Sequence, residues 1–239
     1  MQPDILYQIR DADGAEARIP FHLQDDHSIA VPDDFSPPDW ARLDYHQCSH
    51  CPLSTDTHSY CPIARNLAYL LPQLPPGESY QPISLEVRTE LRNYQQDTTL
   101  QRALGSLFGL ICASSDCPHT RFLRPMARFH LPLSSHTETL VRSTSLYLLQ
   151  QIVQNRQEDQ ASLAGLNERY QTLNELNRCF VKRFQDRNLS DAPVNAMVLL
   201  KTIAQHLNWN LEDDLAELAP LFGTAAPEET TNRFSPGND

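Results

Sequence analysis

Hydrophobic residues near the N-terminus occupy every second position, which is the spacing of a strand with one buried face. The alternation runs over residues 5–9 and resumes over 17–23, and between them the pair Asp13-Gly14 supplies turn chemistry. The two runs therefore predict a β-hairpin. Residues 83–95 begin with the same alternation, so one small antiparallel sheet built from both regions is the simplest arrangement.

From Thr98 onward the hydrophobic spacing changes to three, four and seven residues, the period of an amphipathic helix. Thr98 is a candidate N-cap for the first of these helices, and Ser135 with Glu138 forms the pattern of a capping box before another. Gly223 is placed to end the last one. Helices are expected over residues 63–71, 98–111, 135–149 and 163–184, from 191 onward, and over 210–222.

Three of the six cysteines lie close together in the sequence, between Cys48 and Cys61. Cys48 and Cys51 form a Cys-x2-Cys pair, whose short turn lets both thiolates point at one metal ion. Cys61 is a candidate third ligand, and Cys117, from the helical half, a candidate fourth. Three histidines are alternatives for that last position: His50, His58 and His119. This spacing favours a metal site over a set of ordinary thiols.

Zinc is the predicted metal. Four thiolates would leave zinc closed and unreactive, so the site would be structural and would clip the loop 46–62 onto the helical half. The alternative is a [4Fe–4S] cluster, because Cys51, Cys61 and Cys117 each precede a proline, as some cluster-binding cysteines of ferredoxins do. The spacing of the first three cysteines matches no ferredoxin pattern. Two further cysteines are expected to be buried core residues: Cys112 and Cys179.

These patterns predict an α+β protein, in which a small N-terminal antiparallel sheet with a metal-clipped loop packs on an α-helical C-terminal half. Residues 1–97 form the β-rich part, which includes the cysteine loop 46–62. Residues 98–224 form the helical part, and residues 225–239 are expected to be a disordered tail.

The charge of the chain reverses locally between Cys117 and Glu138. The whole chain has 19 Lys and Arg against 30 Asp and Glu, a net charge of −11, yet residues 118–137 contain no acid. Because arginine binds carboxylate and phosphate groups well, this segment predicts a site for an anion. The residues expected to contact it are Arg121, Arg124, Arg128 and His130.

Two other interpretations of this basic segment stay open. Its arginines can instead pair with acids elsewhere in the fold, as an acidic protein makes easy. Alternatively, Cys117 beside His119 could act as a nucleophile with a lowered pKa. A cysteine that binds a metal is not free for that role, so the nucleophile and the metal site exclude one another.

Composition excludes several classes of function. The acidic balance argues against nonspecific binding of DNA or RNA, which needs a surplus of Lys and Arg. The chain has only 7 glycines and no GxGxxG, GxxxxGK[ST], GxSxG or HExxH motif. Its longest charge-free stretches, 13 residues, are too short to span a bilayer. The N-terminal residues lack the pattern of a secretory signal, so a cytoplasmic location is expected.

Three runs of sequence carry a resemblance: LDYHQCSHCPL, CPIARNLAYL and CPHTRFLRPMARFHLP, joined by the later pair Asn195-Ala196. The chain resembles an uncharacterised bacterial family, a domain of unknown function, over nearly its whole length apart from the tail. The resemblance implies a bacterial cytosolic origin and no particular activity. It singles out eight positions: Cys48, Cys51, Cys61, Cys117, His119, Arg124, Arg128 and His130.

The predicted function is non-catalytic. We expect a cytoplasmic binding or regulatory protein, stabilised by structural zinc, whose basic segment meets an anionic small molecule or an acidic protein surface. One alternative is an enzyme or redox sensor with an iron–sulfur cluster or an open metal site. Another is a scaffold in which helices 136–154 or 161–186 dock a protein. No nucleic-acid partner and no membrane span are expected.

Overall fold

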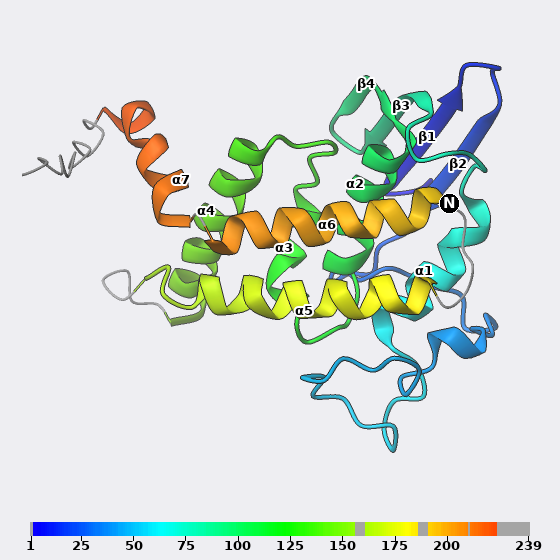
Figure 1. Cartoon of the computed structure of the whole chain (residues 1–239), viewed down its shortest axis with the longest axis horizontal. Coiled ribbons are helices and arrows are strands. Elements are labelled where there is room, and N and C mark those ends of the chain that lie inside the picture. Colours follow the sequence, from blue (N-terminus) through cyan, green and yellow to red (C-terminus); the bar gives the residue numbers. More distant parts are fainter. Residues whose placement is uncertain (1, 156–160, 186–190, 210, 224–239) are drawn as a thin grey trace, which may run out of the picture.

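The computed structural model describes residues 2–155, 161–185, 191–209 and 211–223. Four strands form one antiparallel sheet in the order β2-β1-β3-β4, at the upper right of Figure 1. The predicted hairpin is confirmed, because β1 pairs with β2 and the intervening Gly14 adopts a φ of 83°. The strands are β1 (Ile5–Asp11), β2 (Glu16–Phe21), β3 (Pro82–Thr89) and β4 (Asn93–Thr99).

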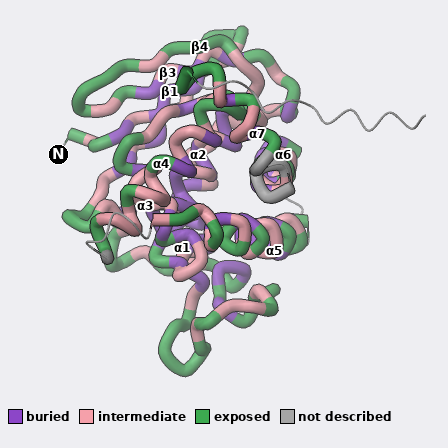
Figure 2. Tube along the Cα trace, turned by 90° about the vertical axis from the view of Figure 1, so that its left-hand side faces the viewer, coloured by how far each residue is buried: buried purple, intermediate pink, exposed green. Residues whose placement is uncertain are grey.

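The two faces of the sheet differ as the sequence alternation requires. On one face hydrophobic side chains are buried against the helical half, among them Tyr7, Ile19 and Val87. On strands β1, β2 and β3 the polar positions carry exposed ion pairs, such as Arg10–Glu16 and Arg88–Glu86. The sheet therefore forms one layer, with the helices on its apolar side (Figure 2).

Strand β4 departs from the expected boundaries. Its residues are mostly polar and exposed, so no alternation marks them. Thr98 lies within this strand opposite Ile83 and is not a helix cap. The helix begins at Leu100, and the preceding Thr99 makes no side-chain capping bond. Pairing with β3 thus extends the sheet into the segment where the local sequence favours a helix start.

Seven α-helices follow or connect these strands within the described residues. The capping box is confirmed, because the Ser135 N–H donates to Glu138 Oε2 (2.8 Å) and the Glu138 N–H donates to Ser135 Oγ (3.2 Å). Gly223 ends the last turn with a φ of 72°. The helices are α1 (Pro62–Leu70), α2 (Leu100–Ala113), α3 (Arg124–Arg128), α4 (His136–Asn155), α5 (Leu166–Gln185), α6 (Asp191–Trp209) and α7 (Leu211–Glu217).

Helices α5 and α6 lie side by side along the long axis of the molecule (Figure 1). The main core joins the sheet, α1, α2 and parts of α5 and α6. A smaller core, which includes Leu140, Tyr170 and Leu218, joins α4, α5 and the last helix turns. The structure is thus α+β, with an N-terminal sheet followed by a helical half, as predicted.

Two expectations concern the ends of the chain and the membrane. The predicted disordered tail, 225–239, lies outside the described residues. No described helix combines the length and apolar character that crossing a membrane would require.

Candidate functional site

The cysteine loop is closed at its base by backbone hydrogen bonds. The Cys61 N–H donates to the Ala41 carbonyl (2.9 Å), and the Leu43 N–H donates to the Ser59 carbonyl (3.0 Å). Between these points the chain projects below α5 (Figure 1) and is largely exposed (Figure 2). The Cys51 N–H donates to the Cys48 carbonyl (3.0 Å), which is the tight turn expected of a Cys-x2-Cys pair.

The four cysteines predicted as ligands all line one small pocket of about 20 Å³ against α5. We call it the cysteine pocket. Cys48 and Cys51 come from the loop, Cys61 lies immediately before α1, and Cys117 follows α2. The structure thus brings together four residues that span 70 positions of sequence. Within the described ranges, no three His, Cys, Asp or Glu side chains are already arranged to hold a metal ion.

The three alternative histidines occupy different positions. His119 lines the cysteine pocket, and its ring centroid lies 4.4 Å from that of His50. Both ring nitrogens of His50 are buried without a hydrogen-bond partner among the described residues. His58 is exposed and its Nδ1 lies 2.9 Å from Thr57 Oγ1. His50 and His119 therefore remain close enough to the cysteines to matter chemically, whereas His58 does not line this pocket.

Burial controls the protonation of the thiols. Desolvation raises the pKa of Cys48 and Cys61, and it raises the pKa of Cys117 to about 11. These three thiols are accordingly protonated at neutral pH, and a metal would have to displace their protons. Cys112 and Cys179 are buried, as expected.

A buried arginine that the sequence analysis missed forms part of this pocket. Arg183, on α5, is only 2% exposed, and its Nη1 donates to the carbonyls of Trp40 (2.5 Å) and Arg42 (3.0 Å). Its guanidinium also lies over the rings of Tyr45 and Phe180. It joins α5 to the start of the cysteine loop and brings a positive charge next to the thiols. No local sequence signal marks Arg183, because it is a single charged residue in an amphipathic helix whose pattern does not show which charged positions are buried.

The arginines of the basic segment have different surroundings. Arg124 pairs with Asp26 (2.9 Å) and Asp116 (2.8 Å), which is the interpretation in which the segment neutralises acids elsewhere. Arg121 and Arg128 are exposed. The contact of these arginines with an anionic ligand stays a prediction.

His130, the last predicted anion-binding residue, is held by hydrogen bonds next to strand β1. Its Nε2 is 2.5 Å from the hydroxyl of Tyr7, which is in turn 3.0 Å from Ser106 Oγ. Ser106 Oγ also accepts the N–H of Leu133 (3.2 Å). Desolvation lowers the pKa of His130 to about 3, so its ring is neutral at pH 7. The histidine joins strand β1 to the segment after α3.

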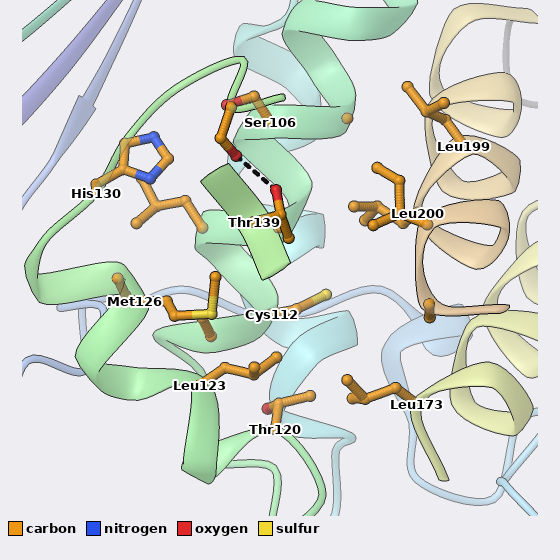
Figure 3. A pocket seen from close by; sticks show the side chains of 18 of the residues that line it. Ser106, Cys112, Thr120, Leu123, Met126, His130, Thr139, Leu173, Leu199 and Leu200 are labelled. Carbon is orange, nitrogen blue, oxygen red and sulfur yellow. Dashed lines mark hydrogen bonds between the residues drawn. The ribbon is translucent and has the colours of Figure 1, made fainter. Parts of the chain in front are cut away.

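His130 and Ser106 also line a much larger pocket, of about 310 Å³, which we call the interhelical pocket. Its walls come from α2, α3, α4, α5 and α6 and from the segment between α3 and α4. Figure 3 shows Leu199 and Leu200 of α6 facing Leu123 and Met126 across the space. Most of the lining side chains are apolar, and Cys112 is among them.

A minority of the described residues that line the interhelical pocket are polar, and none of these is an Asp or Glu. Arg142 of α4 donates from Nη2 to the carbonyls of Met126 (3.0 Å) and Phe129 (2.7 Å). Arg102 is exposed and makes no ion pair with any described residue. Asn177 is buried, and no hydrogen bond joins its amide to the described part of the chain. Ser134 and Thr139 bond each other (3.0 Å; dashed in Figure 3).

Two glycines of α2 also lie on this wall. A Cβ at Gly105 would lie 3.1 Å from Leu199 Cδ2, which is tighter than ordinary contact. A Cβ at Gly109 would lie 3.7 Å from Leu200 Cδ2, an ordinary distance. The sequence analysis missed this pocket, because its lining residues are the apolar helix positions that pattern analysis assigns to a packed core.

Comparison with known proteins gives one positive result. No curated protein and no solved structure matches the chain significantly. A family model described as a domain of unknown function, DUF6901, matches residues 5–223. This range includes the described strands and helices, the cysteine pocket and the interhelical pocket, in agreement with the resemblance to an uncharacterised family. The chain therefore belongs to the DUF6901 family.

Proposed function

We propose that this protein is a binding protein that holds a small, largely apolar molecule in the interhelical pocket. The observation that carries the proposal is a space of about 310 Å³ with mostly apolar walls and a few polar groups. Small-molecule sites have this size and this composition, and they commonly lie between the helices of a bundle.

The pocket has a side that faces solvent and a side that is buried in the protein. Arg102 and Ile203 are exposed lining residues and mark its solvent side. Leu110, Leu173 and Leu176 are buried and form its inner side. A ligand would thus leave water through a rim and bury its apolar part among leucines, which is the favourable step in hydrophobic binding.

The experiment is a titration with 1-octanol in which ligand-observed NMR detects binding. Burying its chain gains about 0.8 kcal/mol for each methylene group, and this gain is opposed by the cost of association. Weak, reversible binding is therefore expected, which this method detects. The test variant is Gly109→Leu, whose side chain would enter the pocket with its Cβ at ordinary distance from Leu200.

Gly109→Ala is the matched control, because it adds one methyl group and leaves most of the space open. We expect Gly109→Leu to weaken octanol binding at least about tenfold and Gly109→Ala to retain it. Octanol that binds wild type and Gly109→Leu equally, or that binds neither, would refute the proposal.

A second proposal follows from the cysteine pocket: Cys48, Cys51, Cys61 and Cys117 hold a structural metal, with zinc preferred. The convergence of four cysteines on one pocket supports it, as do the unpartnered ring nitrogens of the neighbouring His50. The side chains would have to close further around the ion, since no ready-made ligand group is present among the described residues.

The test is metal content together with the visible spectrum of protein purified without oxygen. About one zinc per chain without colour is the expected result, and Cys51→Ser or Cys117→Ser should lose the zinc. Cys112→Ala, a buried cysteine of the interhelical pocket, should retain it. A brown colour would instead indicate that these cysteines hold an iron–sulfur cluster, and it would favour a role as a redox sensor. Colourless protein without metal would refute the metal site.

A further inference from the structure

We infer that the ligand of the interhelical pocket is an amphipathic monoanion, an apolar chain with one carboxylate, and that its carboxylate pairs with Arg142. The inference rests on the proposed function, because it requires that the pocket take up an apolar molecule. It adds that the molecule is negatively charged and that Arg142 binds its charged group.

The position of Arg142 is fixed from one side only. Its Nη2 donates to two carbonyls at the end of α3, that of Met126 within the helix and that of Phe129 immediately after it. The guanidinium has five N–H donors, and those on Nε and Nη1 have no acceptor among the described residues. The arginine is therefore held in place by the backbone and still has donors for an incoming group.

No described acid forms an ion pair with Arg142. Glu138, one turn earlier on the same helix, acts on Arg142 through space, but its exposed carboxylate accepts the Ser135 N–H in the capping box and makes no direct contact with the guanidinium. No described Asp or Glu lines the pocket. A half-buried cation without a directly paired counter-charge is costly, and an anionic ligand that pairs with it inside the pocket removes that cost.

The rest of the lining fits the same ligand. Arg102, exposed at the rim, adds a second positive charge near the entrance and would attract anions from solution. His130 is neutral and already engaged with Tyr7. These local charges oppose the net charge of −11 of the whole chain, so the pocket should disfavour cations while it accepts anions.

A carboxylate fits better than a phosphate monoester. Among the described lining residues, Arg142 is the one half-buried cation, and it can balance one negative charge. A phosphate monoester carries close to two charges at neutral pH and would need further donors in the interior. We therefore commit to a monocarboxylate.

The experiment compares four probes with the same eight-carbon chain at pH 7.5: octanoate, 1-octanol, octylammonium and octyl phosphate. Wild-type protein should bind octanoate at least about tenfold more tightly than octanol, and octylammonium most weakly of the four. If octanoate binds no more tightly than octanol, the inference fails while octanol binding still supports the proposed function. If octyl phosphate binds more tightly than octanoate, the assignment to a carboxylate fails.

The variant Arg142→Gln assigns the charge preference to its residue. Glutamine can still donate to the Phe129 carbonyl that follows α3, and the variant should bind octanoate no more tightly than it binds octanol. Arg142→Lys should restore part of the preference. The matched control is Arg128→Gln, an exposed arginine outside the pocket, which should keep it. An unchanged preference in Arg142→Gln would overturn the assignment, and the wild-type series stands even if this variant does not fold.

Discussion

Helix α5 separates two pockets of opposite character, and Leu176 lines both. The cysteine pocket is small, about 20 Å³, and its chemistry lies in four thiols, His119 and Arg183. The interhelical pocket is about 310 Å³ and its walls are mostly apolar. The first is rich in groups that can bind a metal and has little space, whereas the second has few such groups and ample space. Residue types identify the first kind of site, and only the packing of helices identifies the second.

The arginine of each pocket also has different interaction partners. Arg183 is enclosed by two backbone carbonyls and two aromatic rings, so its charge is used within the protein. Arg142 also bonds two carbonyls, but it lines a space with no acid and retains free donors. The same residue type thus stabilises the fold in one place and is available to a ligand in the other.

The largest effect is expected from Arg183→Met. The change removes two hydrogen bonds and leaves the buried Trp40 carbonyl without its donor, at about 1–3 kcal/mol, whereas the Arg42 carbonyl still accepts the Tyr45 N–H (3.4 Å). We expect the free energy of unfolding to fall by about 3 kcal/mol, measured by urea denaturation. Octanol binding by the folded variant should be unchanged, because Arg183 does not line the interhelical pocket.

Lys182→Met is the control for that variant, since Lys182 is the exposed neighbour on α5. It should change stability by less than about 0.5 kcal/mol. A loss below 1 kcal/mol in Arg183→Met would remove the distinction drawn between the two arginines.

Acid should act through His130, on the wall of the interhelical pocket. Its pKa is lowered to about 3 in the folded protein, against about 6.5 in the unfolded chain. The unfolded state therefore binds a proton between these pH values while the folded state does not, and stability falls as pH decreases through that window.

Between pH 7 and pH 5 this single group should cost about 2 kcal/mol of stability. His130→Gln retains an acceptor for the Tyr7 hydroxyl and cannot take up the proton, so its unfolding free energy should fall by about 2 kcal/mol less than that of wild type. Parallel pH profiles for the two proteins would show that His130 is protonated without penalty.

The smallest effects should come from the basic segment. Arg124 is 16% exposed and pairs with two half-exposed carboxylates, so Arg124→Gln should cost about 1 kcal/mol. Arg128→Gln, without an ion pair in the described residues, should stay within about 0.5 kcal/mol of wild type. Urea denaturation distinguishes the two. Equal losses would show that the ion pairs of Arg124 contribute nothing measurable.

Much of the fold could be predicted because the information is local. The hairpin follows from alternation and from the turn at Gly14, and the start of α4 follows from Ser135 and Glu138. Strand β4 could not be predicted fully, because an edge strand with polar, exposed side chains carries no alternation. Its hydrogen bonds with β3 depend on a partner, and the sequence of β4 alone does not reveal one.

The candidate sites divide in the same way. The residue type and spacing of four cysteines predict that they lie together, and all four line one pocket. Arg142 has no such marker, because its partners are backbone carbonyls, which every sequence contains. Leu199 and Leu200 look like core residues in the sequence, and only the separation of α6 from α3 makes them pocket walls.

The glycine at position 105 gives α2 a particular relation to α6. Because Leu199 Cδ2 already lies 3.1 Å from where a Cβ would stand, even alanine at this position would require the Leu199 side chain to shift by a few tenths of an ångström. Leu199 is also a wall of the interhelical pocket. A single methyl group added to α2 would therefore change the shape of the pocket without altering the charge that Arg142 presents.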